Sequence, residues 1–301
     1  MTQSARAAWC RFGTVLCIAA CRGGDAVPAN DTPAGTTVPR SAGAPVTNAA
    51  TAWPAGLGEL LLAATGAGRT AAILLPDTTS DALARVRGAA LTLTGPLGDV
   101  GQATVSGTEK ADDPECIEWP SARIERDSSS APWTMAVSRG AARGVPFTPF
   151  DALGAADSAA LLVELRRLAS ALPGDTNATF RGLPISVRDA ARARLTDSVT
   201  MIVAEVSRRV GQEAQPLEER VAFIAERLGT DPVWRLRWHQ RVDGLEETIE
   251  ATHLVGVVAM TDGQHVLVLQ RESARGLRFE LFVRQPDGRW DRRWTGPWSG
   301  C

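Results

Sequence analysis

One serine lies in a pattern that is typical of hydrolase nucleophiles. Residues 136–140 read Ala-Val-Ser-Arg-Gly, which matches Gly-x-Ser-x-Gly with alanine in place of the first glycine. In that motif the serine occupies a sharp turn between a strand and a helix, where its hydroxyl is exposed. A strand is plausible before Ser138, but residues 140–149 are rich in turn formers and predict no helix. A hydrolase that uses Ser138, or a metal held by residues distant in sequence, is therefore the alternative to a non-catalytic function.

Basic residues alternate along one predicted strand, at positions Arg235, Arg237, His239 and Arg241. Such a row of positive charges could bind an anionic polymer. If Asp243-Gly244 is a two-residue hairpin turn, however, Arg241 faces Glu246 and Arg237 faces Glu250. The pattern therefore favours a solvated, salt-bridged face, and a basic binding face formed by Arg235, Arg237 and Arg241 is the less favoured hypothesis.

Three tryptophans follow at a spacing of four residues: Trp290, Trp294 and Trp298. Because the spacing is even, their rings should share one face of an extended strand. A row of exposed indoles could stack the sugar rings of a glycan. The alternative is that Trp290 and Trp294 pack in the core against Phe279, Leu281 and Val283, and that Gly296-Pro297 ends the strand before Trp298.

The sequence gives no motif for a metal or a cofactor. His239, His253 and His265 lie on different predicted strands, and none has a second ligand at a metal-binding spacing. The formal net charge is −2, which provides no overall attraction to nucleic acid. We therefore expect no metal, no cofactor and no nucleic-acid partner.

The first residues predict export. Arg6 and Arg11 precede an uncharged run, residues 12–20, that is too short to span a bilayer and has the length of a signal-peptide core. The run ends in Ile18-Ala19-Ala20-Cys21. This segment resembles the lipobox of bacterial lipoproteins, in which small residues precede a cysteine that is acylated and becomes the new N-terminus. The resemblance covers residues 1–21 and implies a signal peptide over 1–20 and a membrane anchor through lipid on Cys21.

The residues after the cysteine are predicted to form a tether. Residues 21–52 are rich in Ala, Pro, Thr and Gly and show no apolar periodicity. In two-membrane bacteria, similar lipoproteins use an aspartate after the lipidated cysteine as an inner-membrane retention signal, and this chain has Arg22 there. The resemblance therefore implies the cell envelope, with the outer membrane favoured over the inner one.

Export also makes a disulfide the expected state of two cysteines. Cys10 and Cys17 leave with the signal peptide and Cys21 is acylated, so Cys116 and Cys301 remain in an oxidising compartment. Their bond would close a long loop, and the chain-entropy model gives about 5 kcal/mol as an upper figure. A metal-binding or redox thiol pair is less favoured because no Cys-x-x-Cys spacing occurs.

Helices are predicted over residues 57–64, 81–86 and, most clearly, 157–172, where four leucines recur on one face and Asp157 could form the cap. Early strands are predicted over 71–75, 89–94, 102–107, 116–124 and 133–138, whereas 186–195 is ambiguous. Three Asp-Gly pairs, at 243–244, 262–263 and 287–288, suggest hairpin turns. The resulting meander has strands at about 199–210, 219–228, 233–242, 245–260, 264–271, 277–285 and 289–296.

These elements predict a mainly β fold of antiparallel meander sheets, sandwich-like or propeller-like, with one substantial helix near 157–172; the alternative is α+β. Residues 53–301 should form a single globular domain, with a possible sub-boundary near 175. The expected function is that of a non-catalytic envelope lipoprotein that binds a partner protein or a cell-wall polymer such as glycan, or that serves as a structural accessory.

Overall fold

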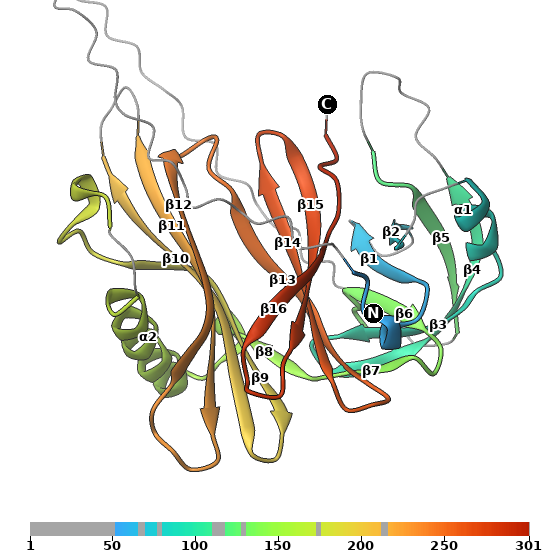
Figure 1. The fold of residues 1–301 in the computed structure, drawn as a ribbon, viewed down its shortest axis with the longest axis horizontal. Coiled ribbons are helices and arrows are strands. Elements are labelled where there is room, and N and C mark those ends of the chain that lie inside the picture. Colours follow the sequence, from blue (N-terminus) through green and yellow to red (C-terminus); the bar gives the residue numbers. More distant parts are fainter. Residues whose placement is uncertain are drawn as a thin grey trace, which may run out of the picture. The chain divides into compact units, whose positions relative to one another are not determined.

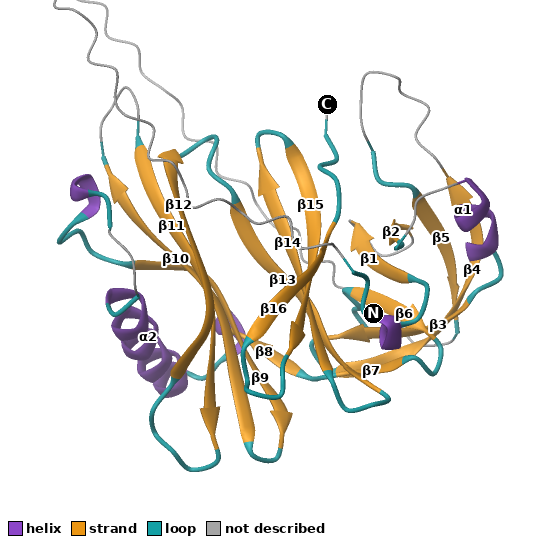
Figure 2. Cartoon of the chain, viewed as in Figure 1, coloured by secondary structure: helices purple, strands orange, loops and turns teal. Residues whose placement is uncertain are grey.

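The computed structural model describes residues 52–65, 70–76, 80–109, 118–127, 131–172, 176–211 and 216–300. The expected signal peptide, Cys21, and the cysteines Cys116 and Cys301 lie outside these residues. Antiparallel sheets and one long helix, α2 (Ala155–Ser170), make up most of the described chain, which confirms the predicted fold class (Figure 2). No helix in the described ranges is both long and apolar enough to cross a membrane.

The first part of the chain forms a closed barrel with strand order β1-β2-β5-β4-β3-β6. The strands are β1 (Leu61–Thr65), β2 (Thr70–Leu74), β3 (Ala90–Gly95), β4 (Gly98–Glu109), β5 (Ser121–Arg126) and β6 (Met135–Ser138). Its core contains Leu62, Ile73 and Leu93, and the helix α1 (Ser80–Val86) packs against this core. Strand β2 is apolar on both faces because its outer side chains, Ala72 and Leu74, pack against a neighbouring sheet.

Two five-stranded sheets make up the rest of the fold. The helix-side sheet has the order β12-β11-β10-β9-β8, with bounds Arg235–Leu245, Leu217–Leu228, Val199–Val210, Ser186–Thr196 and Phe147–Pro149. The barrel-side sheet has the order β16-β15-β14-β13-β7, with bounds Trp290–Thr295, Gly276–Arg284, His265–Ser273, Ala251–Met260 and Ala142–Gly144.

Each sheet is buried on both faces, which explains its long apolar runs. Between the sheets, Met201, Ile224 and Phe282 belong to one sandwich core. The outer face of the helix-side sheet packs against Leu161 and Leu165 of α2, and the outer face of the barrel-side sheet packs against the barrel (Figure 1). The described fold is therefore layered as helix, sheet, sheet and barrel.

Two predictions near the helices are wrong. Residues 57–64 do not form a helix, because a 3-10 turn (Ala55–Leu57) leads into β1, which pairs with both β2 and β6. Pairing on two sides overrides the helical propensity of the leucine and alanine residues. The N-cap of α2 is Gly154, whereas Asp157 lies in the first turn and pairs with Arg192 of β9 at 3.1 Å. The ambiguous segment 186–195 is strand β9.

The predicted hairpin at Asp243-Gly244 is also wrong. Strand β12 runs through both residues, which pair with Glu219 and Glu218 of β11. Strand β11 extends far enough to hydrogen-bond this segment, so the turn propensity of the dipeptide is not used. After Leu245 the chain leaves the helix-side sheet and enters the other as β13, and the meander is broken there. The other two Asp-Gly pairs lie in turns, as predicted, with positive φ at Gly263 and Gly288.

Candidate functional site

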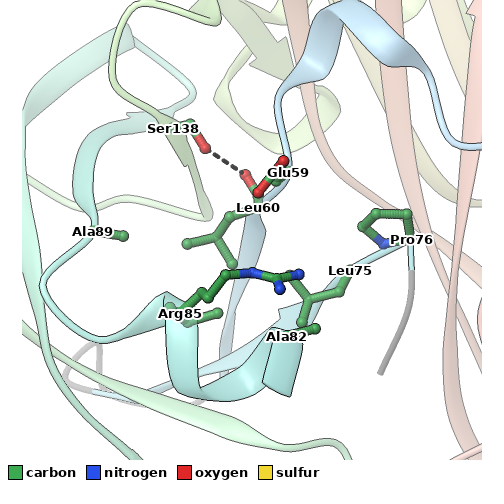
Figure 3. A pocket seen from close by; sticks show the side chains of 9 residues that line it. Glu59, Leu60, Leu75, Pro76, Ala82, Arg85, Ala89 and Ser138 are labelled. Atoms are coloured by element: carbon green, nitrogen blue, oxygen red, sulfur yellow. Dashed lines mark hydrogen bonds between the residues drawn. The ribbon is translucent and has the colours of Figure 1, made fainter. Parts of the chain in front are cut away.

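A pocket of about 230 Å³ opens at one end of the barrel, beside α1 (Figure 3). We call it the barrel-mouth pocket. Five segments of the barrel contribute to its described lining, which consists of Glu59, Leu60, Leu75, Pro76, Ala82, Arg85, Val86, Ala89 and Ser138. Strand ends therefore meet a short helix here, and together they leave this end of the closed barrel partly uncovered.

The floor of the barrel-mouth pocket is the end of the barrel core. Leu60 and Leu75 are each 4% exposed, and Ala82 and Val86 are one helical turn apart on the buried face of α1. The side chain of Ala82 is too short to fill the space beneath the helix. An apolar hollow follows from this combination of an amphipathic helix and a small residue.

Ser138 faces this hollow from the end of β6 (Figure 3). Its hydroxyl donates a hydrogen bond to the main-chain carbonyl of Leu60, with an Oγ to O distance of 3.4 Å. After Ser138 the chain turns and continues as strand β7, so the strand-to-helix context of a nucleophile elbow is not formed. The ionisable residues in the described lining are Glu59 and Arg85, and it contains no histidine to serve as a base.

Glu59 and Arg85 give the pocket a polar rim. Both residues are exposed, and they come from the segment before β1 and from α1. The arrangement is therefore an apolar floor with one carboxylate and one guanidinium at its opening. This combination suits a ligand that places a small apolar group in the pocket and keeps its polar part at the rim.

The three arginines of the predicted basic face do not share an open surface. Arg235 pairs with Asp231 at 3.1 Å, Arg237 lies 3.6 Å from buried Glu226, and Arg241 lies 3.6 Å from buried Glu219. Strand β12 has a bulge at Arg237, since Trp238 pairs with Ile224 and Leu236 with Ala225. The bulge changes which side chains face the sandwich.

The expectation of ion pairing at these arginines is confirmed for Arg237 and Arg241, but the predicted partners are wrong. Glu246 pairs with Arg209 at 2.5 Å, and Glu250 pairs with Arg275 at 2.8 Å. Because 243–244 is not a turn, the register that would have brought these glutamates opposite Arg241 and Arg237 does not occur.

The predicted tryptophan platform is not formed. Trp290 is 2% exposed and lies in the sandwich core, whereas Trp294 is 6% exposed and packs between the barrel-side sheet and the barrel. Strand β16 has a bulge at Arg293, because Trp294 pairs with Leu281 and Arg292 with Phe282. One extra residue reverses the alternation, so the two rings point to opposite faces. The core alternative is confirmed for Trp294, which packs in the same cluster as Phe279, Leu281 and Val283.

Trp298 lies beyond the end of β16 and is half-buried. The guanidinium carbons of Arg275 and Arg278 each lie 4.6 Å from the centre of its ring. Both arginines also contact Glu250. The ring is therefore engaged by cation–π contacts and by a shared ion-pair network.

The three histidines are on three different strands, as predicted. His265 is buried, its Nε2 lies 3.0 Å from the carbonyl of Leu195, and burial lowers its pKa. The pKa of His253 is raised, first by its hydrogen bond to Asp189 at 3.3 Å. Across the described ranges, no group of three or more His, Cys, Asp or Glu residues is placed to hold a metal ion.

Sequence reasoning identified Ser138 but missed the other polar residues of the barrel-mouth pocket. Glu59 and Arg85 carry no motif, and only the closure of the barrel brings them to one opening. The apolar strand at 71–75 and the helix at 81–86 were the available signals, since both flank the pocket. Comparisons with protein-family models, with curated proteins and with solved structures find no match.

Proposed function

We propose that this chain is a non-catalytic lipoprotein of the cell envelope, held at a membrane by lipid on Cys21. We further propose that its β domain binds a partner protein by taking one apolar side chain of that partner into the barrel-mouth pocket. The observation that carries this proposal is the apolar floor under the charged rim of Glu59 and Arg85.

The size of the barrel-mouth pocket argues for a protein partner. At about 230 Å³ it is smaller than most pockets for drug-sized ligands, which occupy about 300–1,000 Å³. Burying one aliphatic or aromatic side chain contributes about 1.5–3 kcal/mol, whereas micromolar binding needs about 8 kcal/mol. The occupant must therefore make further contacts around the opening, as an anchor residue of a protein interface does.

Photo-crosslinking in cells tests the pocket. A benzoylphenylalanine at position 59 should give a defined adduct, which Ala89→Phe should abolish because the new ring occupies the pocket. Ala84→Phe adds the same ring on the exposed side of α1 and should leave the adduct intact. An adduct that persists in the Ala89→Phe variant would rule out the pocket as the docking point.

Labelling with radioactive palmitate tests the anchor. The wild-type chain should incorporate palmitate and the Cys21→Ser variant should not. Equal incorporation in both would refute lipidation at Cys21.

The second candidate is a membrane-tethered hydrolase, which the position of Ser138 in the barrel-mouth pocket favours. A fluorophosphonate probe distinguishes the two functions, because it reacts with activated serines. Under the binding proposal the probe leaves Ser138 unmodified. Stoichiometric labelling that is lost in Ser138→Ala would establish the hydrolase instead.

A further inference from the structure

Two larger hollows meet at the turn between β9 and β10, and neither shares a described lining residue with the barrel-mouth pocket. One has a volume of about 740 Å³ and lies on the outer face of the helix-side sheet; the other has about 760 Å³ and lies at the end of the sandwich. Both are lined by Arg194 and Asp197. We call the combined surface the arginine furrow, after the four arginines that line it: Arg143, Arg192, Arg194 and Arg227.

The arginine furrow has an excess of positive charge. Many arginines of this protein pair with carboxylates, but Arg143, Arg194 and Arg227 have no carboxylate partner within the described residues. Arg194 donates to the main-chain carbonyl of Asp197 at 3.3 Å, and Arg227 lies over the ring of Trp234 at 5.0 Å. Asp197 is the single carboxylate in the described lining of either hollow, so the surface attracts anions.

Strand register sets the spacing of the charges. Thr200 of β10 pairs with Arg194 of β9 on one side and with Arg227 of β11 on the other. Directly paired residues point to the same face, and neighbouring strands are about 4.8 Å apart, so the two arginines begin about 10 Å apart. The hydroxyl-bearing residue Thr200 lies between the two arginines. This spacing suits a ligand whose negative charges repeat along its length and which has hydrogen-bonding groups between those charges.

One wall of the arginine furrow is apolar and held in place. It is formed by the turn between β3 and β4, where Leu97 is 72% exposed. The main-chain carbonyl of Pro96 accepts from the N–H of Phe147 at 2.9 Å, and Asp99 accepts from the N–H of Gly144 at 2.6 Å. These bonds fix the barrel turn to the sandwich, so the wall exists before a ligand binds.

We propose that the arginine furrow binds an anionic cell-wall polysaccharide, a chain of sugar units that carry phosphate or carboxylate groups. Guanidinium forks bind both anions with two parallel hydrogen bonds. The hydroxyls of Thr148, Ser198 and Thr200 can bond to sugar hydroxyls, and Leu97 can contact the C–H face of a ring.

The size of the arginine furrow favours a polymer over a small anion. Two adjoining hollows of more than 700 Å³ each exceed what one phosphate or one lipid headgroup would fill. The inference rests on the proposed envelope location for access to such a polymer, but it uses a different surface from the proposed docking pocket.

Fluorescence anisotropy with labelled oligomers tests the inference on the full-length lipoprotein in detergent. The probes are phosphorylated dextran, polygalacturonate and, as a neutral control, unmodified dextran. Arg194→Gln/Arg227→Gln should weaken binding of the charged probes by about tenfold or more at low salt and reduce their salt dependence. The matched variant Arg87→Gln/Arg181→Gln removes the same charge from two exposed arginines outside the furrow and should bind within twofold of wild type.

Each outcome decides the proposal. Preference for one charged probe identifies phosphate or carboxylate as the recognised group and supports it. Equal losses in the two double variants would show that net charge alone is sensed and would overturn it. Failure of wild type to bind either charged oligomer, or furrow-dependent binding to phosphatidylglycerol vesicles alone, would overturn it as well. The outcome of crosslinking at position 59 does not depend on whether the furrow binds a polymer, so the two proposals can fail separately.

Discussion

Glu226 of β11 is fully buried between the two sheets, and its replacement by alanine should destabilise the fold by about 3–4 kcal/mol. Its carboxylate accepts hydrogen bonds from Arg284 at 2.7 and 2.9 Å and from the indole N–H of Trp290 at 2.9 Å. Arg237 lies 3.6 Å away. Glu226→Ala would leave these donors in the protein interior without their acceptor.

The magnitude follows from these contacts. Each hydrogen bond to a charged group contributes about 1.5 kcal/mol at the low end of its range, so three give about 4.5 kcal/mol. The loss is reduced because Arg284 keeps 21% of its side chain exposed and can recover some hydration. Removing both charges in Glu226→Ala/Arg284→Met should restore at least half of the lost stability, because Arg284, the cation closest to the carboxylate, is then gone as well.

Urea unfolding followed by far-UV circular dichroism measures these free energies. Glu164→Ala is the control, since Glu164 pairs with Arg167 at 2.9 Å on the surface of α2 and should contribute less than about 0.5 kcal/mol. The reasoning fails if Glu226→Ala costs no more than Glu164→Ala. It also fails if Arg284→Met adds its own full cost to that of Glu226→Ala, because the two residues would then be independent.

Three further predictions concern other parts of the fold. Burial raises the pKa of Glu205 above its ordinary value of 4.5, so the contribution of this residue to the free energy of unfolding is fully present below pH 4.5 and is lost as the pH rises through the folded-state pKa. Glu205→Gln should therefore gain stability relative to wild type as the pH rises from about 4 to 7, which urea unfolding at both pH values measures. Gly144→Ala should lower the free energy of unfolding by about 1–3 kcal/mol, because a Cβ there would lie 2.8 Å from the backbone of Gly98. Gly107→Ala is the control, since its Cβ would meet no described atom within 4 Å, and chemical denaturation of both variants measures the difference. Mass spectrometry of the exported, unreduced protein should detect a peptide linking Cys116 to Cys301, and free thiols at both positions would refute the predicted bond.

Strand positions were well predicted because burial leaves a strong local pattern. The strand at 199–210 coincides with β10, and the helix at 157–172 differs from α2 by two residues at each end. The strands predicted at 277–285 and 289–296 lie within one residue of β15 and β16 at each end. Each of these elements has apolar side chains at its own period, and the period is visible without knowledge of the neighbours.

Register was harder to predict, because it depends on single inserted residues. The bulge at Arg293 turns Trp294 away from Trp290, and the bulge at Arg237 separates arginines that alternate in the sequence. A bulge is stabilised by the packing of the partner strand and has no reliable signature in its own strand. Even spacing in the sequence was therefore a poor guide to which side chains share a face.

The candidate sites show the same difference between local patterns, which the sequence reveals, and contacts between distant strands, which it does not. Ser138 was found through its motif, but the residues around it were not, since Glu59, Leu75 and Arg85 meet only when six strands close a barrel. Arg237 and Arg241, which the alternating pattern in the sequence singles out, contact buried glutamates. Arg194 and Arg227, by contrast, have no carboxylate partner in the described structure. Which charge is neutralised depends on contacts between strands, and these cannot be read from one strand alone.

By itself, the sequence determined the class of the fold, most of its strands and its one long helix, because periodicity and turn residues act over a few positions. It also carries the lipobox-like segment that predicts the anchor at Cys21 and the bond between Cys116 and Cys301. Tertiary structure alone decided that Trp290 and Trp294 are buried on opposite faces, and that the barrel mouth and the arginine furrow exist. These features arise where strands distant in the chain meet, and their geometry is set by packing between layers.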